Sequence, residues 1–262
     1  MKAHKLAALI VTTYIGFIST AHASAPQPLF SPEQEARIGE IAAGYLVSHP
    51  EILVTVSNKL QEQQEVRKQK MFALSVMENQ ANLLHDPDTP AYGPENAKVA
   101  VIEFFDYQCV FCSRFAPELE KVMKAQPDVR YLFKEWPIFG GRWEASLQAA
   151  QQGLTVWQKK GAQAYVTYHN AIYATGHNEG KLTVEDIHGA ASKAGLAAPA
   201  PGDHTASLEK NSNLAEALGL TGTPGIIVMP VSGATPDTIT VFPEAVTAEK
   251  LQAAIRKATR VK

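Results

Sequence analysis

Apolar residues recur at two different spacings along the chain, and the spacing changes near residue 98. Between residues 31 and 84 they repeat every three or four positions, which is the spacing of amphipathic helices. Ser31, followed by Pro32 and by acidic residues, marks the start of the first helix. Residues 59–70 are dense in Gln, Glu, Lys and Arg and suit a solvated helix. The helical stripe consists of Ile38, Ile41, Ala42, Tyr45, Leu46, Ile52, Leu53, Val56 and Leu60.

From residue 98 onward, short apolar runs alternate with helical patterns. The runs predict strands at residues 98–105, 129–134, 226–229 and 238–242. The helical patterns predict helices at residues 113–125, 142–152, 213–218 and 247–260. Helix breaks are expected at Gly161, Gly176, Gly180 and Gly195. The resulting order is β-α-β, a long helical insertion, then β-β-α, which is typical of an α/β fold.

The first residues have the features of a secretory signal peptide. Lys2 and Lys5 precede an apolar stretch, residues 6–20, which is too short to span a membrane. Ala21-His22-Ala23 fits a cleavage site. We therefore expect export to the periplasm, an oxidising compartment that permits disulfides. The alternative is an uncleaved anchor.

Four parts are expected: a signal peptide at 1–23, an N-terminal helical region at 24–84, a linker at 85–97, and an α/β domain at 98–262 with its helical insertion at about 140–218. The N-terminal region has no strands, and about 60 helical residues are too few to build a private core. Its apolar stripe must dock on its own domain or on a second copy of the chain. Because a hydrophilic segment separates the stripe from the domain, we favour a homodimer or homotrimer.

Composition narrows the classes of partner. Hydrophobic residues make up 45% of the chain, enough for a sizeable core, and charged residues are interspersed at 19% with a net charge of −2. No basic stripe is visible in the sequence, so nucleic acid is excluded as an expected partner.

The chain has only two cysteines, and both belong to the motif Cys109-Val110-Phe111-Cys112. The motif lies between a predicted strand and a predicted helix. The helix N-terminus there favours a thiolate on Cys109, and the thiolate is the reactive species in disulfide exchange. A structural disulfide and half of a metal site are the alternatives. One cysteine pair in so long an exported chain is not a disulfide framework, which favours a chemical role.

Four motifs together resemble the thioredoxin fold, in its DsbA-like branch with a helical insertion. They are Cys109-Val110-Phe111-Cys112, Glu103-Phe104-Phe105, Lys134-Glu135-Trp136-Pro137-Ile138 and Gly222-Thr223-Pro224, and they extend over residues 98–262. The resemblance implies that Pro224 is cis and that the Thr223-Pro224 loop lies beside the cysteines, where it pairs with a bound peptide.

The resemblance also implies a role for each site residue. Cys109 would be the exposed nucleophile, and Cys112 would be buried and resolve the mixed disulfide. Val110 and Phe111 bring no charge to the thiolate, so the helix N-terminus must stabilise it. Glu103 would be an acid buried beneath the cysteines that shuttles protons to Cys112; the alternative is a solvent-facing strand residue.

Lys134 either pairs with Glu103 or lies at an exposed strand end. Within the family that the chain resembles, a threonine at the position of Thr223 is commoner among disulfide isomerases, whereas a valine is typical of the strong oxidase.

The N-terminal helical region could supply the avidity needed to hold a misfolded substrate, which favours a disulfide isomerase that rearranges wrong disulfides. The architecture also resembles oligomeric DsbC- and ScsC-type proteins. The isomerase's partners would be unfolded or misoxidised secreted proteins and a membrane redox partner, either a reductant or an oxidant. A DsbA-like oxidase that donates disulfides is the alternative within this chemistry.

Two alternatives come from other classes: a copper- or zinc-binding module that uses the two thiols, and a passive chaperone or adhesive module. We expect no cofactor and no metal, because no histidine stands at the spacing of a Cys/His zinc site. The histidines beyond the signal peptide are His49, His85, His169, His177, His188 and His204.

Overall fold

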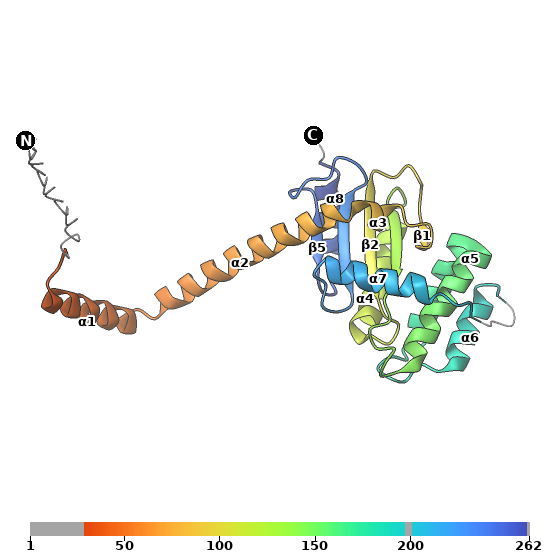
Figure 1. Cartoon of the computed structure of the whole chain (residues 1–262), viewed down its shortest axis with the longest axis horizontal. Coiled ribbons are helices and arrows are strands. Elements are labelled where there is room, and N and C mark those ends of the chain that lie inside the picture. The colour runs from red at the N-terminus through yellow and green to blue at the C-terminus, as the bar shows by residue number, and fades with distance from the viewer. Residues whose placement is uncertain (1–28, 197–200, 261–262) are drawn as a thin grey trace, which may run out of the picture. The chain divides into compact units, whose positions relative to one another are not determined.

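The computed structural model of the chain describes residues 29–196 and 201–260 (Figure 1). Two compact units divide the chain between Lys59 and Leu60, within a single helix. The predicted signal peptide, residues 1–23, lies outside the described residues.

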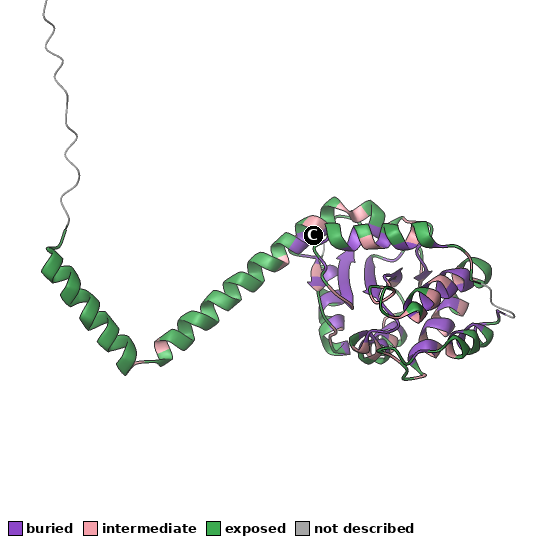
Figure 2. Cartoon of the chain, turned by 60° about the horizontal axis from the view of Figure 1, so that its bottom comes forward, coloured by how far each residue is buried: buried purple, intermediate pink, exposed green. Residues whose placement is uncertain are grey.

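The first unit contains α1 (Pro32–Ser48) and the start of α2 (Glu51–Glu78). Ser31 caps α1 as predicted: its hydroxyl accepts from the Gln34 amide, and the Gln34 side chain accepts from the Ser31 amide. No residue of α1 is buried. Figure 2 accordingly colours α1 and this part of α2 mainly as exposed. The exposed apolar side chains include Ile38, Ile41, Tyr45, Leu46, Val47, Leu53, Val54 and Val56.

The second unit is built on a five-stranded sheet in the order β1-β3-β2-β4-β5, in which only β2 and β3 are parallel. The strands are β1 (Ala91–Tyr92), β2 (Val99–Phe105), β3 (Arg130–Glu135), β4 (Gly225–Pro230) and β5 (Thr240–Phe242). The helices are α3 (Gln80–Leu84), α4 (Val110–Ala125), α5 (Glu144–Tyr173), α6 (Val184–Lys193), α7 (Thr205–Ala217) and α8 (Ala248–Ala258). This is the predicted α/β order with a helical insertion.

Helices cover both faces of the sheet (Figure 1). On one face, α4, α5, α6 and α8 bury a core that includes Phe105, Phe115 and Phe133. On the other face, α7 and the end of α2 bury a core that includes Phe72 and Phe104. Every residue of β2 is buried, because this central strand has a covered face on each side.

The predicted N-terminal region, residues 24–84, extends too far. Phe72, Ala73, Val76 and Leu83 are buried in the core of the second unit. The side chain of Gln69 also donates to the Val241 carbonyl at 2.8 Å. The end of α2 therefore belongs to the α/β unit, because its apolar side chains cover sheet surface that α7 leaves open.

The predicted linker, residues 85–97, is also part of this unit. It contains β1, which pairs with β3, and it supplies Asp86 to a buried ion pair with Lys134. Farther along, α7 begins at Thr205, earlier than the predicted helix at 213–218. Gly161 has φ 78° within α5, and the other three predicted breaks also have positive φ.

Candidate active site

The turn between β2 and α4 places Cys109 at the N-terminus of α4. Asp106 holds the turn: its carboxyl accepts from the Gln108 amide at 2.7 Å, the Phe139 amide at 2.9 Å and the Ser146 hydroxyl at 2.8 Å. The Cys109 amide donates to the Asp106 carbonyl at 3.0 Å. Cys109 is therefore the N-cap residue, with extended backbone, and its sulfur can accept hydrogen bonds from the free amide N–H groups of the first turn.

The pKa values of the two cysteines are shifted in opposite directions. The pKa of Cys109 is lowered to about 6, mainly by a hydrogen bond from the Cys112 thiol. Burial opposes this shift, whereas the Thr223 hydroxyl and the amides of Cys112 and Phe111 support it. Burial raises the pKa of Cys112 well above its ordinary value. The pair thus combines a thiolate at neutral pH with a protonated thiol.

Cys109 is less exposed than predicted. Only 4% of its surface is accessible, and Cys112 is fully buried, as expected. The Thr223-Pro224 loop provides the cover: the Cys109 sulfur donates to the Thr223 carbonyl at 3.2 Å. Phe111 is the exposed residue of the motif, at 54%. The Arg114 guanidinium lies 5.6 Å from the centre of its ring.

The peptide bond between Thr223 and Pro224 is cis, as the resemblance implied. The bond directly precedes β4, whose first residue, Gly225, pairs with Phe104 of β2. Strand pairing therefore holds the loop beside the end of β2 and the cysteines. Within residues 29–196 and 201–260, the buried Thr223 hydroxyl has no hydrogen-bond partner, so it is free to donate to a Cys109 thiolate.

Glu103 is buried rather than solvent-facing. It lies in the middle of β2 with 1% exposure, and neither carboxyl oxygen has a hydrogen-bond partner among the residues that the structure describes. Burial, and then the charge of Cys109, raises the pKa of Glu103 to about 8. Glu103 in turn contributes to the raised pKa of Cys112. The carboxyl is thus electrostatically coupled to both sulfurs.

Lys134 follows neither of the two predictions made for it. It is fully buried, and its ammonium donates to Asp86 at 2.9 Å and to the Asn82 carbonyl at 3.1 Å. Glu103 pairs with Phe133 in the parallel ladder, so Lys134 points to the opposite face of the sheet. The Glu103 carboxyl therefore has no ion pair with this lysine.

Sequence reasoning missed a second buried acid, Glu135, which accepts hydrogen bonds from Tyr107 and Tyr165. The available signals were an acid at the end of an apolar strand and the density of tyrosine in residues 165–173. It also missed Asp106 and Gln108, whose position next to Cys109 was the only hint.

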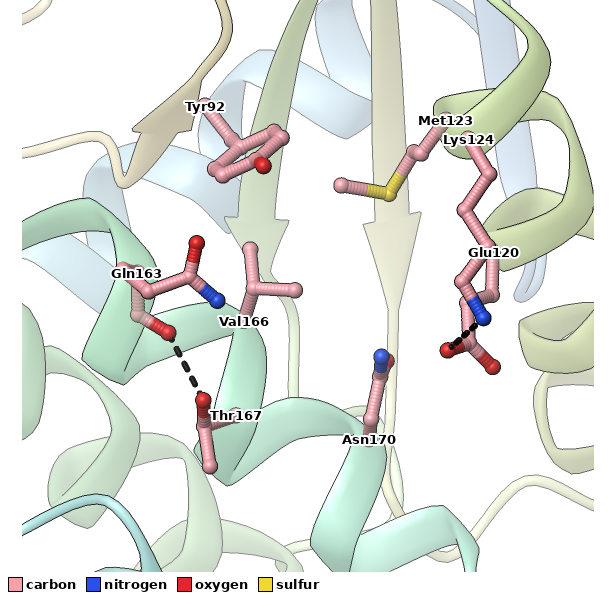
Figure 3. A pocket seen from close by; sticks show the side chains of 8 residues that line it. All are labelled: Tyr92, Glu120, Met123, Lys124, Gln163, Val166, Thr167 and Asn170. Carbon is pink, nitrogen blue, oxygen red and sulfur yellow. Dashed lines mark hydrogen bonds and ion pairs between the residues drawn. The ribbon is translucent and has the colours of Figure 1, made fainter.

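Several pockets border this unit, including two of about 480 Å³ and 300 Å³. The larger of these two is lined in part by Trp136, Pro137 and Ile138, which directly follow β3. The other, of about 300 Å³, lies between α4, α5 and β1 (Figure 3). Its side chains, among them Met123, Gln163 and Asn170, include none of the predicted site residues.

Among residues 29–196 and 201–260, no group of three or more His, Cys, Asp or Glu side chains is arranged to hold a metal ion. Within the same residues, no helix has the length and hydropathy needed to cross a membrane.

Two family models match the chain. The model described as thioredoxin matches residues 85–257, and the model described as copper resistance protein ScsC N-terminal domain matches residues 34–66. A search of curated proteins found no match.

Solved structures resemble most of the chain. BcfH of Salmonella enterica Typhimurium is 38% identical with a TM-score of 0.72, covering 86% of this chain and 96% of its own. ScsC of Proteus mirabilis, in a transitional conformation, is 26% identical with a TM-score of 0.61, covering 89% and 99%. The thiol-disulfide exchange protein α-DsbA2 of Wolbachia pipientis is 21% identical with a TM-score of 0.59, covering 73% and 97%, and it supports the fold alone.

Proposed function

The chain belongs to the thioredoxin family of thiol-disulfide oxidoreductases, and on that premise we propose that it is a periplasmic disulfide isomerase acting through Cys109 and Cys112. The observation that carries the proposal is the pairing of a low-pKa sulfur at a helix N-terminus with a buried, protonated partner beside a cis-proline loop.

In the proposed reaction, the Cys109 thiolate attacks a substrate disulfide. A bond forms between Cys109 and one substrate sulfur, and the other substrate sulfur leaves as a thiolate. That thiolate can attack a different disulfide within the substrate and release Cys109, which completes an isomerisation. If it does not, Cys112 loses its proton to Glu103 and attacks the Cys109 sulfur, and the substrate leaves reduced. Val110, Phe111, Thr223 and Pro224 would contact the bound peptide.

The N-terminal arm, which consists of α1 and the part of α2 up to Lys59, supports isomerisation over oxidation. Its apolar side chains are exposed, and it matches the family model for the ScsC N-terminal domain. Docked against the arms of other copies, these side chains would form a homodimer or homotrimer. Several sites facing one substrate raise the effective concentration of thiolate, which helps to hold a misfolded protein while its disulfides are rearranged.

The expected partners follow from this chemistry. Unfolded or misoxidised secreted proteins would be the substrates. An isomerase must return to its reduced form, so a membrane reductant would be its redox partner; the alternative, a DsbA-like oxidase, would need a membrane oxidant.

Refolding of scrambled ribonuclease by the full-length protein tests this proposal. Cys109→Ala should abolish the activity. Ile41→Asp should dissociate the oligomer, measured by light scattering, and reduce isomerisation more than simple thiol exchange. Ala43→Asp places the same charge on the opposite side of α1 and is the matched control. Equal isomerase activity in a dissociated Ile41→Asp protein would refute the role of the arm.

The same experiments separate the alternatives. An oxidase would oxidise reduced ribonuclease quickly but leave scrambled ribonuclease unchanged. A metal module would retain a stoichiometric copper or zinc ion that a chelator removes, and a passive chaperone would keep its activity without either sulfur.

A further inference from the structure

A groove lies between α7 and the segment that joins β3 to α5. Its volume is about 480 Å³, and one wall consists of residues 136–138 together with Leu147 of α5. The other wall is a single side of α7, because its lining residues follow one another at helical spacing. They are Thr205, Leu208, Glu209, Ser212 and Glu216. None of these residues has a part in the reaction described above.

Two hydrogen bonds join the walls of the groove. The Trp136 ring nitrogen donates to the Ser212 hydroxyl at 3.3 Å, and the Asn211 side chain donates to the Glu135 carbonyl at 3.0 Å. Asn211 is buried, so its bond to the end of β3 lies within the unit. The groove is therefore already formed in the protein without a bound partner.

The wall that follows β3 is also joined to the turn that carries Cys109. The Trp136 amide donates to the Phe105 carbonyl at 2.9 Å. The Phe139 amide donates to the Asp106 carboxyl, also at 2.9 Å. Both acceptors lie within four residues of Cys109 in the sequence. A polypeptide that is joined to Cys109 by a disulfide can therefore reach this groove with a neighbouring segment.

The groove offers an apolar surface. Ile138 and Leu147 are among the large apolar side chains that remain exposed, whereas Trp136 and Leu208 are buried at its base. Pockets that bind ligands combine such a surface with a few polar groups that fix orientation. Here the hydroxyl of Ser212 and the carboxylates of α7 supply the polar groups. An apolar side chain that enters would be partly removed from water, which favours binding.

The rim of the groove is negatively charged. Of the described residues that line it, Glu209 and Glu216 carry a charge and none is basic. Both glutamates are exposed, and neither has an ion pair within residues 29–196 and 201–260. The next residue of α7, Lys210, pairs with Asp86 at 2.8 Å rather than with either of them. Two such carboxylates attract a cationic partner and repel an acidic one.

We propose that this groove is a subsite for substrate polypeptides and that it prefers segments in which an apolar side chain lies next to lysine or arginine. The apolar side chain would enter the groove, and the cation would pair with Glu209 or Glu216. The inference rests on the proposed function, because a mixed disulfide with Cys109 holds the substrate while the groove is filled. The groove would thereby select basic, apolar segments over acidic ones.

Two peptides test the charge preference on the reduced full-length protein. Each has one cysteine in a disulfide with thionitrobenzoate, and a flexible glycine-serine linker joins this cysteine to Phe-Lys-Lys or to Phe-Glu-Glu. The Cys109 thiolate attacks the peptide sulfur, a disulfide forms between them, and thionitrobenzoate leaves with the electron pair of the broken bond. Its absorbance gives the second-order rate constant. At low ionic strength the lysine peptide should react about tenfold faster than the glutamate peptide.

Removing the charge of the rim should remove most of this preference. In the double variant Glu209→Gln, Glu216→Gln the ratio of the two rate constants should fall to about threefold or less. The matched control is the double variant Glu95→Gln, Glu185→Gln, which changes the net charge equally at exposed glutamates outside the groove. The control should keep the wild-type ratio.

Removing apolar surface from the groove should slow both peptides. Leu147→Ser should lower their rate constants about threefold. Val184→Ser replaces an exposed apolar side chain on α6, outside the groove, and is the matched control. Every variant should react with free 5,5′-dithiobis(2-nitrobenzoate) as fast as the wild type, because this reagent has no peptide segment to fill the groove.

Equal rate constants for the two peptides in the wild type would overturn the proposal. So would an equal loss of preference in the two double variants, or equal slowing by Leu147→Ser and Val184→Ser. Faster reaction of the lysine peptide with the Ile41→Asp protein would also overturn it, because a second copy of the chain would then occupy the groove. If the groove double variant does not fold, Glu209→Gln and Leu147→Ser decide. A wild-type protein that does not react with the free reagent would instead refute the proposed function.

Discussion

Replacing Cys112 by alanine tests what holds the pKa of Cys109 down. The ordinary thiol value is 9.0 and the value in this protein is about 6, with the hydrogen bond from Cys112 as the largest cause. The difference corresponds to ~4 kcal/mol of preferential stabilisation of the thiolate. Cys112→Ala should raise the pKa of Cys109 by at least about one unit, or ~1.4 kcal/mol, because burial is then opposed only by weaker donors.

The matched variant is Cys112→Ser, whose hydroxyl can still donate to the Cys109 sulfur. Both variants contain a single cysteine, so the thiolate absorbance at 240 nm titrates Cys109 alone. Cys112→Ser should titrate near the wild-type value, and Cys112→Ala clearly above it. At pH 7 the thiolate fraction should fall from about nine-tenths to about one-half or less in Cys112→Ala.

Equal pKa values in the serine and alanine variants would show that the hydrogen bond is not the cause. The helix N-terminus and Thr223 would then have to account for the whole shift. An ordinary pKa in the wild-type protein would remove the physical basis of the proposed activity itself.

Three further predictions concern stability, each measured by urea unfolding of the reduced protein. The lowered pKa of Cys109 stabilises the folded state fully above pH about 9, and this contribution disappears as the pH falls through about 6. Between pH 5 and pH 7, the free energy of unfolding of the wild type should therefore rise by ~1.4 kcal/mol more than that of Cys109→Ser. Parallel plots of unfolding free energy against pH for the two proteins would contradict this. Lys134→Met leaves Asp86 without its buried ammonium and should cost about 3–5 kcal/mol, whereas a loss below about 1 kcal/mol would mean that Lys210 alone satisfies Asp86. Phe72→Ala should lower the free energy of unfolding by about 3–5 kcal/mol, because Phe72 is buried against the sheet. Met71→Ala, at an exposed neighbouring residue, should change it by no more than about 0.5 kcal/mol. Equal effects would show that the end of α2 does not pack on the sheet.

Much of the fold could be predicted because its signals are local. The buried run of β2, the N-cap at Ser31 and the four glycine breaks each depend on residues within one turn or one strand, and the structure has them where expected. The cysteine motif could be placed at a strand-to-helix junction for the same reason. Element ends were less well predicted, as where α7 starts eight residues early at Thr205, and the predicted linker at 85–97 proved to contain β1.

Tertiary structure alone decided the surroundings of the site. The cover over Cys109 comes from Thr223, 114 residues away; the partner of Lys134 is Asp86, 48 residues away; and the donors to Glu135 lie 28 and 30 residues away. A sequence shows which residues can ionise and which face of a strand they share. Their burial and their partners, and therefore their proton affinities, depend on which distant segments the fold packs against them.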